Sequence, residues 1–123
     1  MEPALQILLV EDNISNQKVM NAYLDYLGQV TTVACSASEA LELARAARFD
    51  LVLSDIQLPD MSGIDLIAVL REMADPVPYL VAVTAMARSD GEAHYRELGF
   101  DGYLAKPVWR EDLQHLLGKV MSG

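Results

Sequence analysis

The sequence predicts one α/β domain in which helices cover both faces of a parallel β-sheet. Short apolar runs alternate along the chain with segments whose apolar residues recur every three or four positions, the spacing of one face of a helix. The connections between these segments are short, and such alternation produces a parallel sheet with right-handed crossovers. Hydrophobic residues make up 52% of the 123 residues, which suits strands that are buried on both faces.

Five apolar runs are expected to form the strands, each with the length of an ordinary strand. They cover residues 5–10, 30–34, 51–54, 79–83 and 102–105. Helical spacing predicts five helices, over residues 16–27, 38–47, 63–73, 89–98 and 112–120. Five strands that alternate with five helices favour a doubly wound, flavodoxin-like parallel sheet with the strand order 2-1-3-4-5.

Residues suited to helix ends mark several of these boundaries. Gly28 follows the first helix and Gly99 follows the fourth, and glycine is common where a helix ends in a left-handed conformation. Ser38 is predicted to cap the second helix, because a serine hydroxyl can accept a hydrogen bond from a backbone N–H of the first turn. Asp60 is interpreted as a loop and helix-start residue.

Polar side chains stand where four of the predicted strands end. Glu11 and Asp12 follow the first strand, Asp55 the third, Thr84 the fourth and Lys106 the fifth. Because the carboxyl ends of parallel strands share one edge of a sheet, we expect these side chains to converge. Carboxylate oxygens are ligands that Mg²⁺ prefers, and an aspartate can attack phosphorus to give an aspartyl phosphate. Each residue alone has a plainer interpretation, as a capping, turn or surface residue, but together they favour a phosphorylatable aspartate beside a divalent cation.

The charge and composition disfavour some classes of function. The net charge is -9, from 18 acidic and 9 basic residues, and such a surface repels nucleic-acid phosphates and anionic lipid. No apolar run reaches the roughly 18 residues of a membrane span, and no signal peptide is recognisable. The single cysteine, Cys35, excludes an internal disulfide. We therefore expect a cytoplasmic domain, residues 1–123, that binds neither nucleic acid nor membrane and is monomeric when isolated.

Four segments together resemble the receiver domain of two-component response regulators, over essentially the whole chain. They are, in order, ILLVEDN, DLVLSDIQLPDMSG, VAVTA and LAKP. The resemblance implies that Asp55 accepts a phosphoryl group from a phosphohistidine on a histidine kinase or a histidine phosphotransfer domain. It also implies a Mg²⁺ site formed by the carboxylates of Glu11, Asp12 and Asp55 and by the backbone carbonyl of Gln57.

The same resemblance implies roles for residues around the phosphoacceptor. Thr84 is the switch hydroxyl, Lys106 is the partner of the phosphoryl group, and Tyr103 is the aromatic side chain that changes rotamer. Their movement would remodel the face formed by the fourth helix, fifth strand and fifth helix. Gln57 and Met86 stand where members of the family carry side chains that tune the lifetime of the phosphoryl group. Because Gln57 could orient a hydrolytic water and Met86 cannot, we expect an intermediate lifetime.

The opening motif VEDNISNQKV is similar to receivers of hybrid histidine kinases. This implies a domain taken from a longer kinase, and a free-standing single-domain regulator is the alternative. Kinase activity is expected only of such a longer protein, since a receiver phosphorylates and dephosphorylates only itself. Trp109 replaces the Ser or Thr that many receivers of this subgroup place before the last helix. It either anchors a partner near the face of the fourth helix, fifth strand and fifth helix or, as we favour, packs on neighbouring apolar side chains.

Two other classes of protein share parts of this pattern. A dehalogenase-like phosphohydrolase also forms an aspartyl phosphate. That class expects a second acid two residues after the nucleophile, where Gln57 stands, and a cap domain, for which this chain has no room. A degenerate receiver that serves only as an interaction module is disfavoured, because this sequence retains Asp12, Asp55, Thr84 and Lys106.

Overall fold

A computed structural model describes residues 4–85 and 91–122 of the chain. These residues form one sheet of five parallel strands in the predicted order, β2-β1-β3-β4-β5. The strands are β1 (Gln6–Val10), β2 (Val30–Ala34), β3 (Leu51–Asp55), β4 (Tyr79–Thr84) and β5 (Gly102–Ala105). Strands β3 and β4 end one residue later than predicted, because Asp55 and Thr84 still pair with residues of the neighbouring strand.

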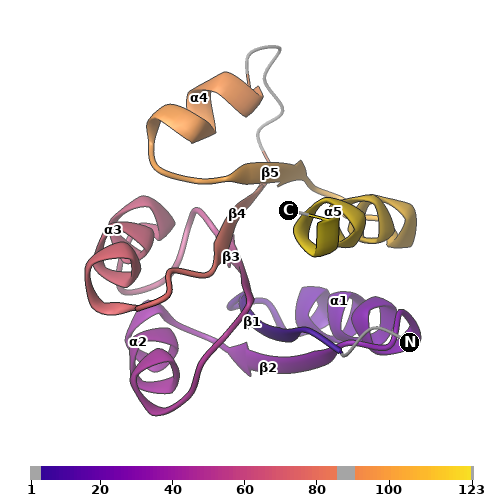
Figure 1. Ribbon diagram of the computed structural model, residues 1–123, viewed down its shortest axis with the longest axis horizontal. Helices are drawn as coiled ribbons and strands as arrows, with labels where there is room; N and C mark the ends of the chain where they lie inside the picture. Colours follow the sequence, from indigo (N-terminus) through magenta and orange to yellow (C-terminus); the bar gives the residue numbers. More distant parts are fainter. Residues whose placement is uncertain (1–3, 86–90, 123) are drawn as a thin grey trace.

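Helices cover both faces of the sheet, as predicted (Figure 1). They are α1 (Ile14–Tyr26), α2 (Ala37–Ala46), α3 (Gly63–Met73), α4 (Gly91–Glu97) and α5 (Arg110–Ser122). Helices α1 and α5 lie on one face, where Leu24 and Leu113 pack in a core cluster with Leu53. Helices α2, α3 and α4 lie on the other face, where Leu66 and Phe100 belong to a second cluster. Over the described residues, the helices lack the length and apolar character that crossing a membrane requires.

The cap of helix α2 differs from the prediction. Ser36 is the N-cap, since its backbone is extended and its Oγ accepts a hydrogen bond from the N–H of Glu39 at 3.2 Å. The prediction of Ser38 for this role is wrong, because Ser38 already belongs to the helix. The backbone N–H of Ser38 donates instead to Oδ2 of Asp60, at 2.9 Å. Asp60 therefore caps the start of α2 from another part of the chain.

The other helix ends follow local rules. Gly28 and Gly99 both have positive φ, +80° and +106°, as expected for glycines that follow a helix. Helix α5 begins two residues before its predicted start, although Trp109 offers no side-chain oxygen as a cap. Asp112 compensates, since its Oδ2 accepts a hydrogen bond from the backbone N–H of Trp109 at 2.9 Å. The predicted start of the fourth helix, Ser89, lies outside the described residues.

Candidate functional site

The polar residues at the strand ends meet at the carboxyl edge of the sheet. One surface cleft is lined by all of them, namely Glu11, Asp12, Asp55, Thr84 and Lys106. Carboxylate oxygens of Glu11, Asp12 and Asp55 lie within 4.8 Å of one another. Glu11 and Asp55 are buried, whereas Asp12 is exposed, so solvent reaches the cluster at Asp12. The parallel topology thus brings together residues that are far apart in the sequence.

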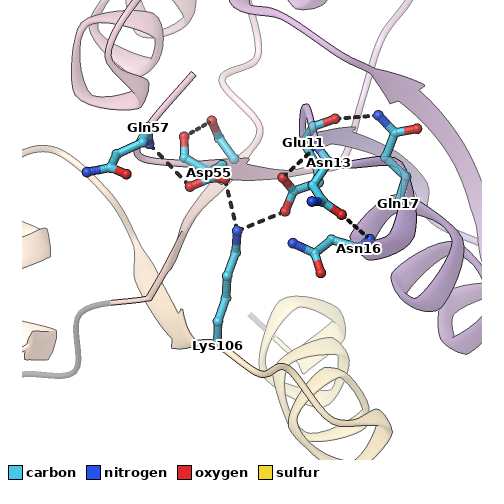
Figure 2. A network of polar contacts seen from close by, with 8 residues as sticks. Glu11, Asn13, Asn16, Gln17, Asp55, Gln57 and Lys106 are labelled. Atoms are coloured by element: carbon cyan, nitrogen blue, oxygen red, sulfur yellow. Dashed lines mark hydrogen bonds and ion pairs between the residues drawn. The ribbon is translucent and has the colours of Figure 1, made fainter. Parts of the chain in front are cut away.

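Lys106 joins the two buried carboxylates (Figure 2). Its Nζ lies 2.9 Å from Oδ2 of Asp55 and 2.9 Å from Oε1 of Glu11. Burial acts to lower the pKa of Lys106, but the hydrogen bonds and charges of Asp55 and Glu11 outweigh it and raise the pKa above its ordinary value. The lysine is therefore a permanently charged group at neutral pH, with its ammonium directed at Asp55.

Three carboxylates surround one ammonium, and the pKa of the most buried carboxylate, that of Glu11, departs from its ordinary value. Burial raises the pKa of Glu11 above its ordinary value, although Lys106 and the N–H of Asn13 act to lower it. Three carboxylates against one ammonium leave negative charge that a divalent cation can neutralise. Hard oxygen donors in a site open to water on one side are the donor set that suits Mg²⁺. The side chains present therefore fit a magnesium ion.

The β3–α3 loop holds Asp55 from the other side. The backbone N–H of Gln57 donates to Oδ1 of Asp55 at 3.2 Å (Figure 2). The loop closes through a hydrogen bond from the N–H of Gly63 to the carbonyl of Ile56 at 2.7 Å. A Cβ on Gly63 would lie 2.2 Å from the Asp55 carbonyl oxygen, so only glycine permits this close approach. Both carboxylate oxygens of Asp55 are thus oriented, and the side chain of Gln57 is exposed.

The predicted switch residues lie on the α4 side of the cleft. Thr84 is buried at the end of β4. Tyr103 is half-buried on β5, and its ring stacks on Tyr95 of α4 with centroids 5.3 Å apart. Tyr95 itself lines the cleft together with Thr84. Sequence reasoning missed Tyr95, although its helical spacing from Leu98 placed it on the inward face of α4. Met86, the other predicted lifetime residue, lies outside the described residues.

Trp109 does not lie near the face formed by α4, β5 and α5, where the partner-anchor alternative placed it. It lines an apolar cleft with Val19, Met20 and Tyr23 of α1, and the same cleft is bordered by Lys106. Its side chain is 56% exposed, so it is not buried among its neighbours. The cleft lies between α1 and the start of α5, not on the face formed by α4, β5 and α5. Trp109 therefore stands next to the carboxylate cluster, because its cleft shares Glu11 and Lys106 with the cleft that holds the cluster.

Comparison with known proteins identifies the class of protein that this fold and site define. The family model of the response regulator receiver domain matches residues 7–118, so the chain belongs to that family. It is a receiver domain of the two-component type, and its relatives include sensor kinases. The resemblance drawn from the four sequence motifs is thereby confirmed.

The relatives include both long sensor proteins and a short regulator. Aerobic respiration control sensor protein ArcB of Escherichia coli strain K12 is 43% identical over 108 residues, which cover 86% of this chain and 14% of ArcB. Polar-differentiation response regulator DivK of Brucella anthropi is 36% identical over 104 residues, which cover 83% of this chain and 84% of DivK. The solved receiver domain of sensor histidine kinase PA1611 from Pseudomonas aeruginosa PAO1 holds a magnesium ion in its active site cleft. It matches with a TM-score of 0.86 and 33% identity, covering 98% of this chain and 100% of that one.

Proposed function

We propose that residues 1–123 act as a phosphoacceptor domain, in which Asp55 takes a phosphoryl group from a phosphohistidine. A carboxylate oxygen of Asp55 forms a bond to phosphorus as the bond between phosphorus and the imidazole nitrogen breaks. The imidazole leaves with the electron pair of that bond and is protonated. The observation that carries the proposal is the geometry of Asp55, whose two oxygens are held by a backbone N–H and by Lys106 within a carboxylate cluster.

Mg²⁺ is the cofactor that we propose for this site. The carboxylates of Glu11, Asp12 and Asp55 and the backbone carbonyl of Gln57 would hold it, and the ion would neutralise charge on the phosphoryl oxygens. The magnesium ion in the cleft of the PA1611 receiver domain supports this proposal. Lys106 pairs with Asp55 before transfer and can follow the charge onto the phosphoryl group afterwards, while Glu11 keeps the ammonium in place.

We further propose that the phosphoryl group acts through Thr84 and Tyr103. The new dianion draws the Thr84 hydroxyl towards Asp55, and Tyr103 then changes its place beside α4. The stacking of Tyr103 on Tyr95 supports this coupling, because Tyr95 lines the same cleft as Thr84. A change in the Tyr103 ring would therefore reach the face formed by α4, β5 and α5.

The phosphodonor would be a histidine kinase or a histidine phosphotransfer domain. Either must bring an imidazole to Asp55 and so must contact the rim of the cleft. Large apolar side chains are exposed beside it, since Val19 and Trp109, 47% and 56% exposed, line the neighbouring cleft that shares Glu11 and Lys106. Apolar side chains of this kind beside a polar reaction site suit a helical partner with an apolar face. We propose that Trp109 contacts the donor, and Trp109→Ala should then weaken transfer from the donor.

We also propose the kind of protein to which this domain belongs. The chain spans only 14% of ArcB, which suits one domain of a hybrid histidine kinase, whereas its coverage of DivK, 84%, suits a free-standing regulator. We favour the hybrid kinase, with the domain monomeric when isolated, in the cytoplasm and without contact to nucleic acid or membrane. The family match favours a receiver over a dehalogenase-like phosphohydrolase.

Phosphate transfer to variants of the chain tests the proposal. The wild-type chain, Asp55→Asn and the matched control Asp65→Asn are each mixed with a histidine-phosphorylated phosphotransfer domain and Mg²⁺. Asp65 is an exposed aspartate on α3, outside the cleft. The wild type and Asp65→Asn should take up the label, and Asp55→Asn should take up none. Uptake by Asp55→Asn at the wild-type rate would overturn the assignment.

A further inference from the structure

Gln17 on α1 makes a contact with the end of β1 that the predicted site did not include. Its side-chain Nε2 donates a hydrogen bond to the backbone carbonyl oxygen of Glu11, at 2.6 Å (Figure 2). The side chain is half-buried, and the bond spans from the fourth residue of the helix back to the strand end. A side chain of α1 thus reaches the peptide that links the first two carboxylate residues of the cluster.

The remaining groups of Glu11 are held by other partners. Its backbone N–H donates to the carbonyl of Ala34 at 3.0 Å, one carboxylate oxygen accepts from the N–H of Asn13 at 3.2 Å, and the other lies 2.9 Å from Lys106. The carbonyl oxygen is the one group of Glu11 that relies on Gln17. Without the Gln17 donor, the backbone carbonyl of Glu11, a buried residue, would lose this hydrogen bond.

The carbonyl of Glu11 and the N–H of Asp12 belong to the same planar peptide unit. A hydrogen bond that fixes the carbonyl therefore fixes the direction in which the chain enters Asp12. Among the described residues, no side chain forms a hydrogen bond or ion pair with the Asp12 carboxylate. The backbone sets the direction of the Asp12 Cα–Cβ bond, and so the side from which its carboxylate approaches those of Glu11 and Asp55, within 4.8 Å.

We propose that Gln17 is a positioning residue for the cation site, which holds the Glu11–Asp12 peptide so that the Asp12 carboxylate faces Glu11 and Asp55. The inference rests on the proposed function, because it requires that this cluster binds Mg²⁺. Residues that orient metal ligands typically change metal affinity by about 10-fold to 100-fold when they are replaced. Because the Gln17 bond acts through one peptide unit, we expect an effect at the lower end, about 10-fold.

Mg²⁺ titration of three proteins tests this role: the wild type, Gln17→Met and the control Gln114→Met. Methionine keeps the length of the side chain and removes the donor, and Gln114 is an exposed glutamine on α5 outside the cleft. Fluorescence of Trp109, the one tryptophan, reports binding, since the indole lines a cleft bordered by Glu11 and Lys106. Isothermal titration calorimetry checks the dissociation constants.

The dissociation constant of Gln17→Met should rise by about 10-fold, and that of Gln114→Met should stay within about twofold of the wild type. A folded Gln17→Met protein that binds Mg²⁺ as tightly as the wild type would show that Gln17 only anchors α1, and would overturn the inference. If Gln17→Met does not fold, Gln17→Asn, which withdraws the amide by one carbon, must show the weaker binding instead. A wild-type chain that binds no Mg²⁺ would refute the proposed function itself, and the inference with it.

Discussion

Replacing Lys106 by methionine leaves two buried carboxylates without their cation. Lys106 lies 2.9 Å from both Asp55 and Glu11, whose side chains are 11% and 2% exposed. Removal of one partner from a fully buried ion pair costs about 3–5 kcal/mol, because the other charge is left uncompensated. The Lys106 side chain is itself 22% exposed, so we expect a smaller loss, about 2–3 kcal/mol at neutral pH without Mg²⁺. For a chain of this size the midpoint of thermal unfolding should fall by about 10 °C.

Urea unfolding in the presence of a chelator measures this loss. Lys119→Met, at an exposed lysine of α5, serves as the control for the removal of a positive charge. The deficit of Lys106→Met should shrink as the pH falls, since protonation of the carboxylates removes their repulsion. Mg²⁺ should stabilise Lys106→Met more than it stabilises the wild type, because the ion replaces the missing positive charge. Equal stability of Lys106→Met and Lys119→Met in the chelator would refute the reasoning.

Three further substitutions address other parts of the structure. Burial raises the pKa of Glu11, so the free energy of unfolding of the Mg²⁺-free wild type should decline as the pH rises through that raised pKa. Urea titrations at several pH values should show that Glu11→Gln lacks this decline, and identical pH profiles of the two proteins would contradict the prediction. Hydrogen bonds from the backbone N–H groups of Ser38 and Ala37 lower the pKa of Asp60. The contribution of this carboxylate to the stability of the fold is therefore complete above its unfolded-state pKa and is lost as the pH falls through its folded-state pKa. Asp60→Asn should lack this acid-dependent part of the unfolding free energy, and an unchanged acid profile would contradict the contact. In Gly91→Ala the new Cβ would lie 2.5 Å from Cζ of Tyr103, so the ring must move, at a cost of about 1–3 kcal/mol in stability. NMR spectra in which the Tyr103 ring resonances do not shift would exclude this movement.

The sheet and the carboxylate cluster could be predicted because each strand and each polar residue at its end is visible in a short stretch of sequence. The parallel topology then brings these strand ends together. Each strand is a short apolar run, and in four of the five a polar residue, such as Asp55 or Lys106, directly follows the run or ends it. Parallel strands place all these ends at one edge, so a list of strand ends becomes a site without any knowledge of distant contacts. The motifs around these residues then carried the family resemblance.

The contacts that support the site could not be predicted, because they depend on which atoms meet in space. Asp60 caps α2 from 22 residues away, and the sequence near Asp60 indicates a loop and a helix start without indicating that the helix is α2. Ser36 and Ser38 are equally suitable caps by type, and only the backbone conformation distinguishes them. Trp109 carries no periodic pattern, so its position against α1 rather than the α4 side follows from the path of the chain after β5.

The central claim is that Asp55 receives the phosphoryl group. After transfer from a phosphorylated histidine donor, borohydride trapping and peptide mass spectrometry identify the residue that carried the phosphate. We expect the label on the peptide that contains Asp55, only when Mg²⁺ is present. Label on another residue of this chain, such as His94 or His115, or transfer that proceeds equally well without a divalent cation, would contradict the account.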